Sequence, residues 1–274
     1  MKLRLGVVGA GNMGTALVAG IVSSKALAAR SITVTDVDAR KWALLGKKYA
    51  VRTAADNQAV ARWAQALVLC VKPQQVPELL KEVGGLLSPD GWVMSVAAGI
   101  QTKQIEAVLG RVGVVRVMPN TPALMGAGAL VYCLGRHARR SQEIAAVTIL
   151  STLGKVWKTT ESHMDAVTAL SGSGPAYVFY LAECLVAAGT ALGLPAPLAD
   201  ALARQTVWGA GRMLAESSDP AGELRRRVTS PGGTTEAALK VLTGRAMDTL
   251  FKDALAAACR RSKELSTLDK EMKT

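Results

Sequence analysis

Hydrophobic residues in the first 160 positions fall into short runs separated by helical patterns. The runs that predict strands are Leu3–Val8, Ile32–Thr35, a weak one near Val51, Leu67–Val71, Trp92–Val96 and Val112–Met118. Helices are predicted at Met13–Val22 and Ser141–Thr152. This alternation is typical of a parallel sheet covered by helices. Gly128–Cys133 is predicted as an antiparallel edge strand, and Lys155–Lys158 as a last short strand.

From His163 onward the pattern is helical only. The predicted helices are Asp165–Leu170, Pro175–Leu192, Pro197–Glu216, Thr235–Leu242 and Ala246–Leu265. Proline suits the first turn of a helix, because the N–H that it lacks has no helical partner there. We therefore expect an α/β domain over residues 1–160, followed by an all-α domain over residues 161–274.

The stretch Ala166–Leu194 is apolar apart from a single charged residue, Glu183. An acid in the middle of a membrane span is costly, so a span is not expected. We interpret this stretch as a helix buried at a subunit or domain interface.

The net charge and the distribution of basic residues indicate which ligands the protein could bind. The formal net charge is +12, but the basic residues are scattered and the densest cluster is Arg225-Arg226-Arg227. No aromatic residues lie among them to stack on bases, so nucleic-acid binding is not expected. The charge fits attraction of an anionic cofactor and substrate, or an ordinary solvated surface.

Cysteine and histidine are too sparse to suggest a metal site. Cys70, Cys133, Cys184 and Cys259 stand far apart, and there are only two histidines. We expect free thiols in a reducing, cytoplasmic compartment, since no signal-peptide pattern is present.

A nucleotide-binding motif follows the first predicted strand. The segment Gly9-Ala10-Gly11-Asn12-Met13-Gly14 matches G-x-G-x-x-G and opens a helix. The first glycine permits a tight turn, the second admits a pyrophosphate and the third lets helix and strand approach. The N-terminal half is therefore predicted to be a Rossmann-type domain that binds a dinucleotide.

Three further segments lie where such a cofactor would bind, at the carboxyl ends of strands. Asp36 ends the second strand and is expected to accept hydrogen bonds from ribose hydroxyls, which favours NADH, although Arg40 and Lys41 could reach a 2′-phosphate. An acid there could instead cap the next helix. Val71-Lys72-Pro73 and Ala97-Ala98-Gly99 follow later strands and could equally be ordinary loops.

The second motif, Ser230-Pro231-Gly232-Gly233-Thr234-Thr235, lies directly before a helical pattern near the end of the chain. Glycines and hydroxyls beside free N–H groups suit a carboxylate ligand, although an ordinary capped turn has the same composition.

Taken together, these motifs resemble those of the pyrroline-5-carboxylate reductases over nearly the whole chain. Besides GAGNMG, VKP and AAG, the resemblance rests on RVMPNTPALMGAG at 116–128, DAVTALSGSGPAYVF at 165–179 and VTSPGGTT at 228–235. It implies a Rossmann domain joined to a helical domain that forms intertwined dimers, which often assemble into decamers.

The resemblance also implies the site residues. The nucleotide would contact Gly9, Asn12, Met13, Asn57, Val71, Lys72, Pro73, Ala97 and Gly99. The glycine motif and the strand ends described above add Gly11, Gly14, Asp36 and Ala98 to the expected nucleotide site. The substrate would contact Ser171, Gly172, Ser173, Gly174, Pro175, Gly232, Gly233, Thr234 and Thr235. Family members use NADPH, NADH or both. The chain departs from the family in Arg226 and Arg227, where an acid is common.

The implied reaction is hydride transfer from a reduced nicotinamide to the C=N carbon of 1-pyrroline-5-carboxylate, giving L-proline. A protonated cyclic imine is already electrophilic, so no nucleophile or metal is expected. Thr235 is expected to hydrogen-bond the ring nitrogen as the catalytic residue, although it could merely cap a helix. A six-membered imine stays open as a second substrate.

Two other functions share features of this sequence. Reductases of the β-hydroxyacid dehydrogenase class share the two-domain plan but need a lysine in the interdomain helix, and Ser173–Leu185 contains none. A nucleotide-sensing protein without turnover is disfavoured by the intact SPGGTT and SGSGPA loops.

Overall fold

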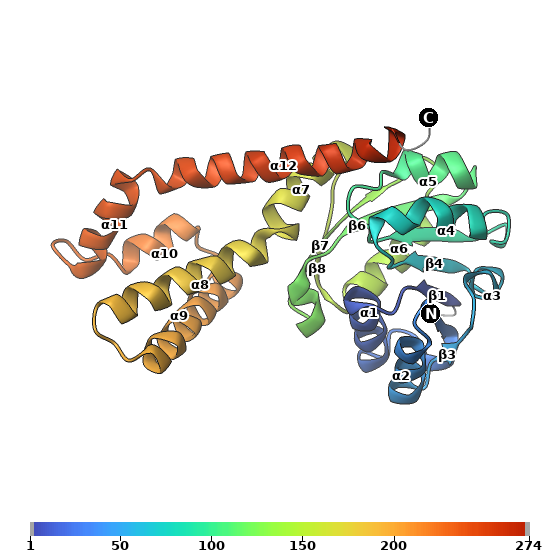
Figure 1. Ribbon diagram of the computed structural model, residues 1–274, viewed down its shortest axis with the longest axis horizontal. Coiled ribbons are helices and arrows are strands. Elements are labelled where there is room, and N and C mark those ends of the chain that lie inside the picture. Colours follow the sequence, from blue (N-terminus) through green and yellow to red (C-terminus); the bar gives the residue numbers. More distant parts are fainter. Residues whose placement is uncertain (1–2, 272–274) are drawn as a thin grey trace. The chain divides into compact units, whose positions relative to one another are not determined.

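The computed structural model describes the backbone of residues 3–271 and the side chains of residues 3–266. It contains an eight-stranded sheet and a set of helices that follows it (Figure 1). The strands are β1 (Leu5–Val8), β2 (Ile32–Thr35), β3 (Arg52–Thr53), β4 (Ala66–Leu69), β5 (Trp92–Ser95), β6 (Gly113–Met118), β7 (Gly128–Leu134) and β8 (Gly154–Lys158). No strand follows β8 in the described residues, so the predicted fold class is confirmed.

The sheet order is β3-β2-β1-β4-β5-β6-β7-β8. Every pair is parallel except β6 with β7. β7 was correctly predicted to be antiparallel, but the prediction of an edge strand was wrong. β8 pairs with it in parallel, from Gly128↔Gly154 to Tyr132↔Lys158, and so β8 forms the edge.

Helices cover both faces of the sheet. One buried cluster joins α1 (Asn12–Ser23), α2 (Ala39–Tyr49) and α6 (Arg140–Leu150) to the sheet. A second cluster lies on the other face under α3 (Asn57–Trp63), α4 (Val76–Val83) and α5 (Thr102–Leu109). The strands of the central sheet are buried on both faces, which explains their continuous apolar sequences.

The later helices are α7 (Met164–Val167), α8 (Gly174–Ala191), α9 (Ala196–Glu216), α10 (Ala221–Arg227), α11 (Thr234–Gly244) and α12 (Met247–Glu271). Between α7 and α8 lies a π-helical turn, η5 (Thr168–Gly172). Short 3-10 turns lie at η1 (Ala29–Ser31), η2 (Pro73–Gln75), η3 (Thr121–Met125) and η4 (Glu161–His163). Of the described helices, none is long and apolar enough to cross a membrane.

The chain divides into two compact units, and the division differs from the boundary expected after residue 160. The sheet unit runs to Ser173 and takes in α12 from Ala258, whereas the helical unit is Gly174–Ala257. Met164 and Ala169 are buried, which ties α7 and η5 to the sheet unit. The end of α12 returns to it, because the Ser262 hydroxyl donates to the Asp165 carboxylate at 2.7 Å.

The helical unit has almost no core within one chain. Among its described residues only Ala199 and Ala203 are buried, and α8 buries none. Large apolar side chains are exposed instead, including Leu192 (86%), Tyr180 (67%) and Leu250 (64%).

Candidate functional site: a dinucleotide cavity at the start of α1

The glycine motif forms a tight turn between β1 and α1. Gly9 has a φ of +101°, and a Cβ there would lie 2.7 Å from the backbone of Cys70. A Cβ on Gly14 would collide with the carbonyl oxygen of Gly9. A Cβ on Gly11 would meet nothing within 4 Å. Gly9 and Gly14 therefore allow the chain to pack, whereas Gly11 leaves open space for a ligand.

The N-terminus of α1 offers free donors beside that space. The N-cap residue, Gly11, provides no side-chain cap. The helical bonding begins with the Thr15 N–H, which donates to the Gly11 carbonyl at 2.9 Å. The N–H groups of Asn12, Met13 and Gly14 precede it and, together with the helix dipole, suit a phosphate.

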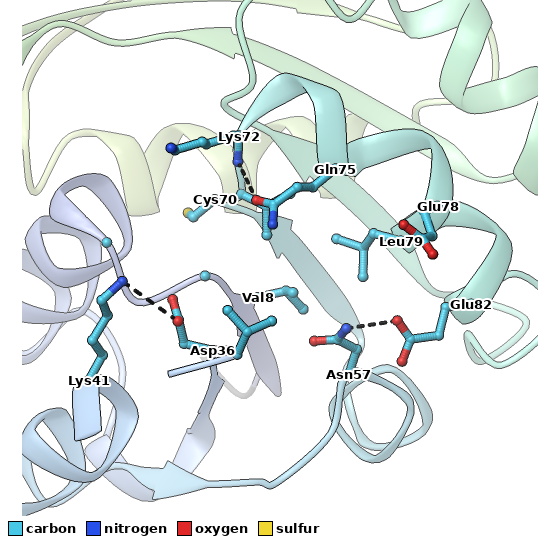
Figure 2. A pocket seen from close by; sticks show the side chains of 14 residues that line it. Val8, Asp36, Lys41, Asn57, Cys70, Lys72, Gln75, Glu78, Leu79 and Glu82 are labelled. Carbon is cyan, nitrogen blue, oxygen red and sulfur yellow. Dashed lines mark hydrogen bonds and ion pairs between the residues drawn. The ribbon is translucent and has the colours of Figure 1, made fainter. Parts of the chain in front are cut away.

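A cavity of about 530 Å³ opens beside this turn (Figure 2). That volume lies in the usual range for small-molecule sites. Six of the predicted nucleotide residues line it: Gly9, Gly11, Asp36, Asn57, Val71 and Lys72. Asn12, Met13, Gly14, Pro73, Ala97, Ala98 and Gly99 are not among its lining residues. Lys41, which was expected to be within reach of a 2′-phosphate, also lines the cavity. Sequence reasoning missed Val8 and Cys70, which directly precede predicted residues, and Val37, Gln75, Glu78, Leu79 and Glu82, which no local pattern marks.

Asp36 is held firmly at the end of β2. Its carboxylate accepts hydrogen bonds from the Ala10 N–H at 2.7 Å and the Asp38 N–H at 2.9 Å. Lys41 lies 3.8 Å away as an ion-pair partner (Figure 2). The carboxylate does not cap α2, since that role belongs to Asp38, which accepts from the Arg40 N–H. Asp36 thus ties the glycine turn to β2 while facing the cavity.

Asn57 and Lys72 also line the cavity. The Asn57 amide donates to Glu82 at 2.8 Å, and the Lys72 N–H donates to the Gln75 side chain at 3.2 Å (Figure 2). These bonds leave the Asn57 carbonyl oxygen and the exposed Lys72 ammonium as available polar groups.

The Ala97-Ala98-Gly99 loop leaves β5 at the same edge of the sheet. β1, β4 and β5 are parallel neighbours, so their carboxyl ends lie side by side. Gly99 has a φ of +78°, and a Cβ there would lie 3.6 Å from Ser266 of α12. The loop is therefore packed on one side and needs its glycine for the turn.

A polar network that sequence reasoning missed lies behind this loop. Glu161 pairs with the buried guanidinium of Arg116 on β6. It also accepts from the N–H (3.1 Å) and hydroxyl (2.7 Å) of Thr102 at the start of α5. Burial opposes the charged form of Glu161, but Arg116 and these hydrogen bonds outweigh it and leave the pKa of the carboxyl below its usual value.

Cys70 and Cys133 are poor nucleophiles. Burial raises the pKa of both Cys70 and Cys133 to about 12, so neither is a thiolate at neutral pH. Within residues 3–271 no cluster of three or more His, Cys, Asp or Glu side chains could hold a metal.

The predicted substrate residues lie in two segments. Ser171, Gly172 and Ser173 close η5 in the sheet unit, and Gly174 and Pro175 begin α8. Gly232, Gly233, Thr234 and Thr235 form the turn into α11. The first segment spans the boundary between the two compact units, which falls between Ser173 and Gly174, and the second segment lies within the helical unit.

At the start of α11, a carboxylate already binds the turn. The Gly232 N–H donates to Glu236 at 2.7 Å, and Gly232 has a φ of +71°. The Ala237 N–H makes the first bond to the Gly233 carbonyl, so the N–H groups of Thr234, Thr235 and Glu236 precede it. Gly233 provides no side-chain cap. This geometry favours an anion.

A glycine turn, an open helix start and a cavity at the carboxyl ends of parallel strands define a dinucleotide-dependent oxidoreductase. Residues 4–99 match the family described as NADP oxidoreductase coenzyme F420-dependent, and residues 161–265 match pyrroline-5-carboxylate reductase dimerisation.

A pyrroline-5-carboxylate reductase from Synechocystis sp. is 37% identical over 97% of this chain and 99% of its own. The structure of a pyrroline-5-carboxylate reductase from Coxiella burnetii superposes with a TM-score of 0.93 at 39% identity, covering 97% of this chain and 99% of that one. The Plasmodium falciparum pyrroline carboxylate reductase with NADP bound has a TM-score of 0.85 at 29% identity, over 97% and 99% of the two chains. The chain belongs to the pyrroline-5-carboxylate reductase family.

Proposed function

We propose that this protein catalyses the NAD(P)H-dependent reduction of 1-pyrroline-5-carboxylate to L-proline, the last step of proline biosynthesis. The observation that carries the proposal is the open α1 N-terminus: Gly11 leaves space beside free N–H groups, in a chain of this family. When bound, the reduced nicotinamide supplies the hydride, and the protein supplies position and electrostatics.

The protein's task is to hold a small anionic imine. We assign the substrate carboxylate to the N–H groups at the start of α11 and to the Ser171–Gly174 segment. The Glu236 carboxylate on the Gly232 N–H shows the kind of group that this turn accepts.

Thr235 is the proposed catalytic residue. Its side chain is half-buried, and no hydrogen bond of its hydroxyl is recorded among the described residues. A hydroxyl that does not cap its own helix is available to a ligand. We assign it to hydrogen-bonding the ring nitrogen of the imine and supporting its protonated form.

The test is steady-state oxidation of NADH and NADPH that depends on the imine. Thr235→Ala should lower kcat/KM on the order of tenfold or more, the typical loss for a catalytic hydrogen-bond donor, whereas Thr235→Ser should retain most activity. Thr243→Ala is the matched control, because Thr243 on the same helix donates only to the Leu239 and Lys240 carbonyls. An unchanged kcat/KM in folded Thr235→Ala would remove Thr235 from the mechanism.

We infer that the cofactor preference leans towards NADH. A 2′-phosphate would meet the Asp36 carboxylate, and the two cations that follow Asp36 in the sequence, Arg40 and Lys41, already pair with carboxylates. Arg40 pairs with Asp38 through two hydrogen bonds of 3.0 Å, and Lys41 lies beside Asp36.

Asp36→Ser should raise kcat/KM for NADPH relative to NADH. Removing a repulsive charge in a partly solvated site is worth roughly 1–2 kcal/mol, which is about tenfold. Arg40→Ala, an exposed neighbour, should leave the ratio within twofold. A wild-type enzyme that already prefers NADPH would refute this assignment of Asp36.

We propose that residues 161–274 serve substrate binding and dimerisation, within a homo-oligomer. The exposed apolar side chains of the helical unit need a partner, since an 84-residue unit with two buried alanines has too little core to be stable alone. A second copy would cover them in a dimer, and dimers would assemble into a decamer. Light scattering during gel filtration tests both steps, and a monomer at micromolar concentration would refute them.

Four free cysteines without a disulfide fit a reducing compartment, and we propose the cytoplasm. Fractionation of cells that express the protein tests this.

A further inference from the structure

Asn120, two residues after the end of β6, links two segments that are far apart in the sequence. Its side-chain carbonyl accepts the Ala129 N–H of β7 at 2.9 Å. Its side-chain amide donates to the Ser171 carbonyl of η5 at 3.1 Å. Both ends of the amide are used, and the partners determine which end faces which segment.

The ordinary role for asparagine at this position does not apply. Asn120 precedes η3, and asparagine is a favoured N-cap residue. Its side chain nevertheless makes no capping bond to η3. It is committed instead to β7 and η5, which sequence reasoning could not foresee.

Pro175 deprives the Ser171 carbonyl of the donor that an α-helix would provide. In an α-helix this carbonyl would accept from the N–H of residue 175, but that residue is Pro175, which has none. The π turn is closed by the Ser173 N–H, which donates to the Thr168 carbonyl at 2.8 Å. The Ser171 hydroxyl is used as well, donating to the Val167 carbonyl at 3.1 Å. Asn120 thus supplies the hydrogen bond that the proline removes.

Met118, two residues earlier on β6, supports the neighbouring residue. Its terminal methyl group lies where a Cβ of Gly172 would be. The backbone of Gly172 therefore lies directly on the Met118 side chain. The chain at the end of β6 therefore supports η5 in two ways. The polar side chain of Asn120 bonds to Ser171, and the apolar side chain of Met118 packs on Gly172.

We propose that Asn120 is a positioning residue for the substrate: it orients the Ser171–Gly174 segment through the Ser171 carbonyl, and so sets affinity for the anionic imine and for proline. This rests on the proposed function, which places that segment at the substrate. Asn120 is assigned no contact with the substrate itself.

Asn120→Asp is the sharpest test, because it keeps the size and the acceptor for Ala129 but replaces the donor with an oxygen that repels the Ser171 carbonyl. We expect the KM for the imine and the inhibition constant for L-proline to rise on the order of tenfold, the factor that corresponds to about 1.4 kcal/mol. The KM for NADH should stay within twofold.

Tyr132→Phe is the matched control. Tyr132 lies on β7, the strand that Asn120 also contacts, and this change removes its buried hydrogen bond of 2.8 Å to Glu143 on α6 without touching η5. It should lower the melting temperature without changing the KM for the imine. If Asn120→Asp behaves like Tyr132→Phe, with lower stability and unchanged substrate and proline constants, the proposal is wrong.

Amide hydrogen exchange separates this proposal from the proposed function. Asn120→Asp should speed exchange in peptides covering residues 168–178 and leave those of α4 unchanged, whether or not the enzyme turns over the imine. A wild-type protein that oxidises neither NADH nor NADPH in the presence of the imine would refute the function, whereas unchanged exchange at residues 168–178 would refute the role of Asn120.

Discussion

Removal of the Glu161 carboxylate should destabilise the protein strongly, because it leaves the Arg116 guanidinium buried without a counter-charge in the sheet unit. The Arg116 side chain is only 2% exposed, and Glu161 is its sole ion-pair partner among the described residues. Glu161→Ala would leave that guanidinium buried and unpaired. It would also remove the acceptor of the Thr102 N–H and hydroxyl.

The magnitude follows from burial. Breaking a buried ion pair by removing one partner costs about 3–5 kcal/mol. Glu161 is itself 31% exposed, so water can reach the vacated space, and we expect the lower end, about 3 kcal/mol. At roughly 2–4 °C per kcal/mol for a protein of this size, the melting temperature should fall by about 6–12 °C.

The assay is thermal unfolding followed by circular dichroism. The protein concentration must be fixed, because oligomer stability depends on it. Arg212→Ala is the control for an exposed pair, since Arg212 and Glu216 are 59% and 64% exposed, and it should cost less than about 1 kcal/mol. The double change Arg116→Met with Glu161→Met should be less harmful than Glu161→Ala, because no charge stays buried.

The reasoning would be refuted if Glu161→Ala lowered the melting temperature no more than Arg212→Ala. It would also fail if the double variant were as unstable as Glu161→Ala, since the cost would then come from lost packing and not from the unpaired charge.

Two further predictions follow from the glycine turn and from Glu143. Gly11→Ala should fold with an unchanged melting temperature but bind NADH at least tenfold more weakly, as measured by fluorescence titration. Gly14→Ala should lose stability, because its Cβ would meet the Gly9 carbonyl. Equal melting temperatures for the two variants would contradict this reasoning. Hydrogen bonds from Lys158, Tyr132 and Arg140 lower the pKa of Glu143 to about 2. Its stabilising contribution is therefore complete above its usual pKa and is lost as the pH falls from about 4.5 towards 2. Glu143→Gln should accordingly reduce the difference between the urea unfolding midpoints at pH 5 and pH 3. An unaltered difference would mean that groups other than Glu143 cause the loss of stability in acid.

Local sequence determined most of the secondary structure. The strand at Ile32–Thr35 matches its prediction, and the helix predicted at Pro197–Glu216 is found at Ala196–Glu216. Apolar runs and helix-start residues act within a few positions, so they can be recognised without the fold. The glycine motif was equally clear, because the roles of Gly9 and Gly14 depend on the turn that they themselves form.

Only the tertiary structure decided which distant residues meet. The partners Arg116 and Glu161, and Asn120 and Ser171, lie in different elements, and no local pattern pairs them. The return of α12 to Asp165, and the position of β7 inside the sheet, depend on long-range packing in the same way. The sequence by itself thus determined the elements and the glycine motif that is predicted to bind a nucleotide. The long-range hydrogen bonds and ion pairs around the site could be identified only from the fold, because hydrogen bonding and burial depend on distance in space and not on separation along the chain.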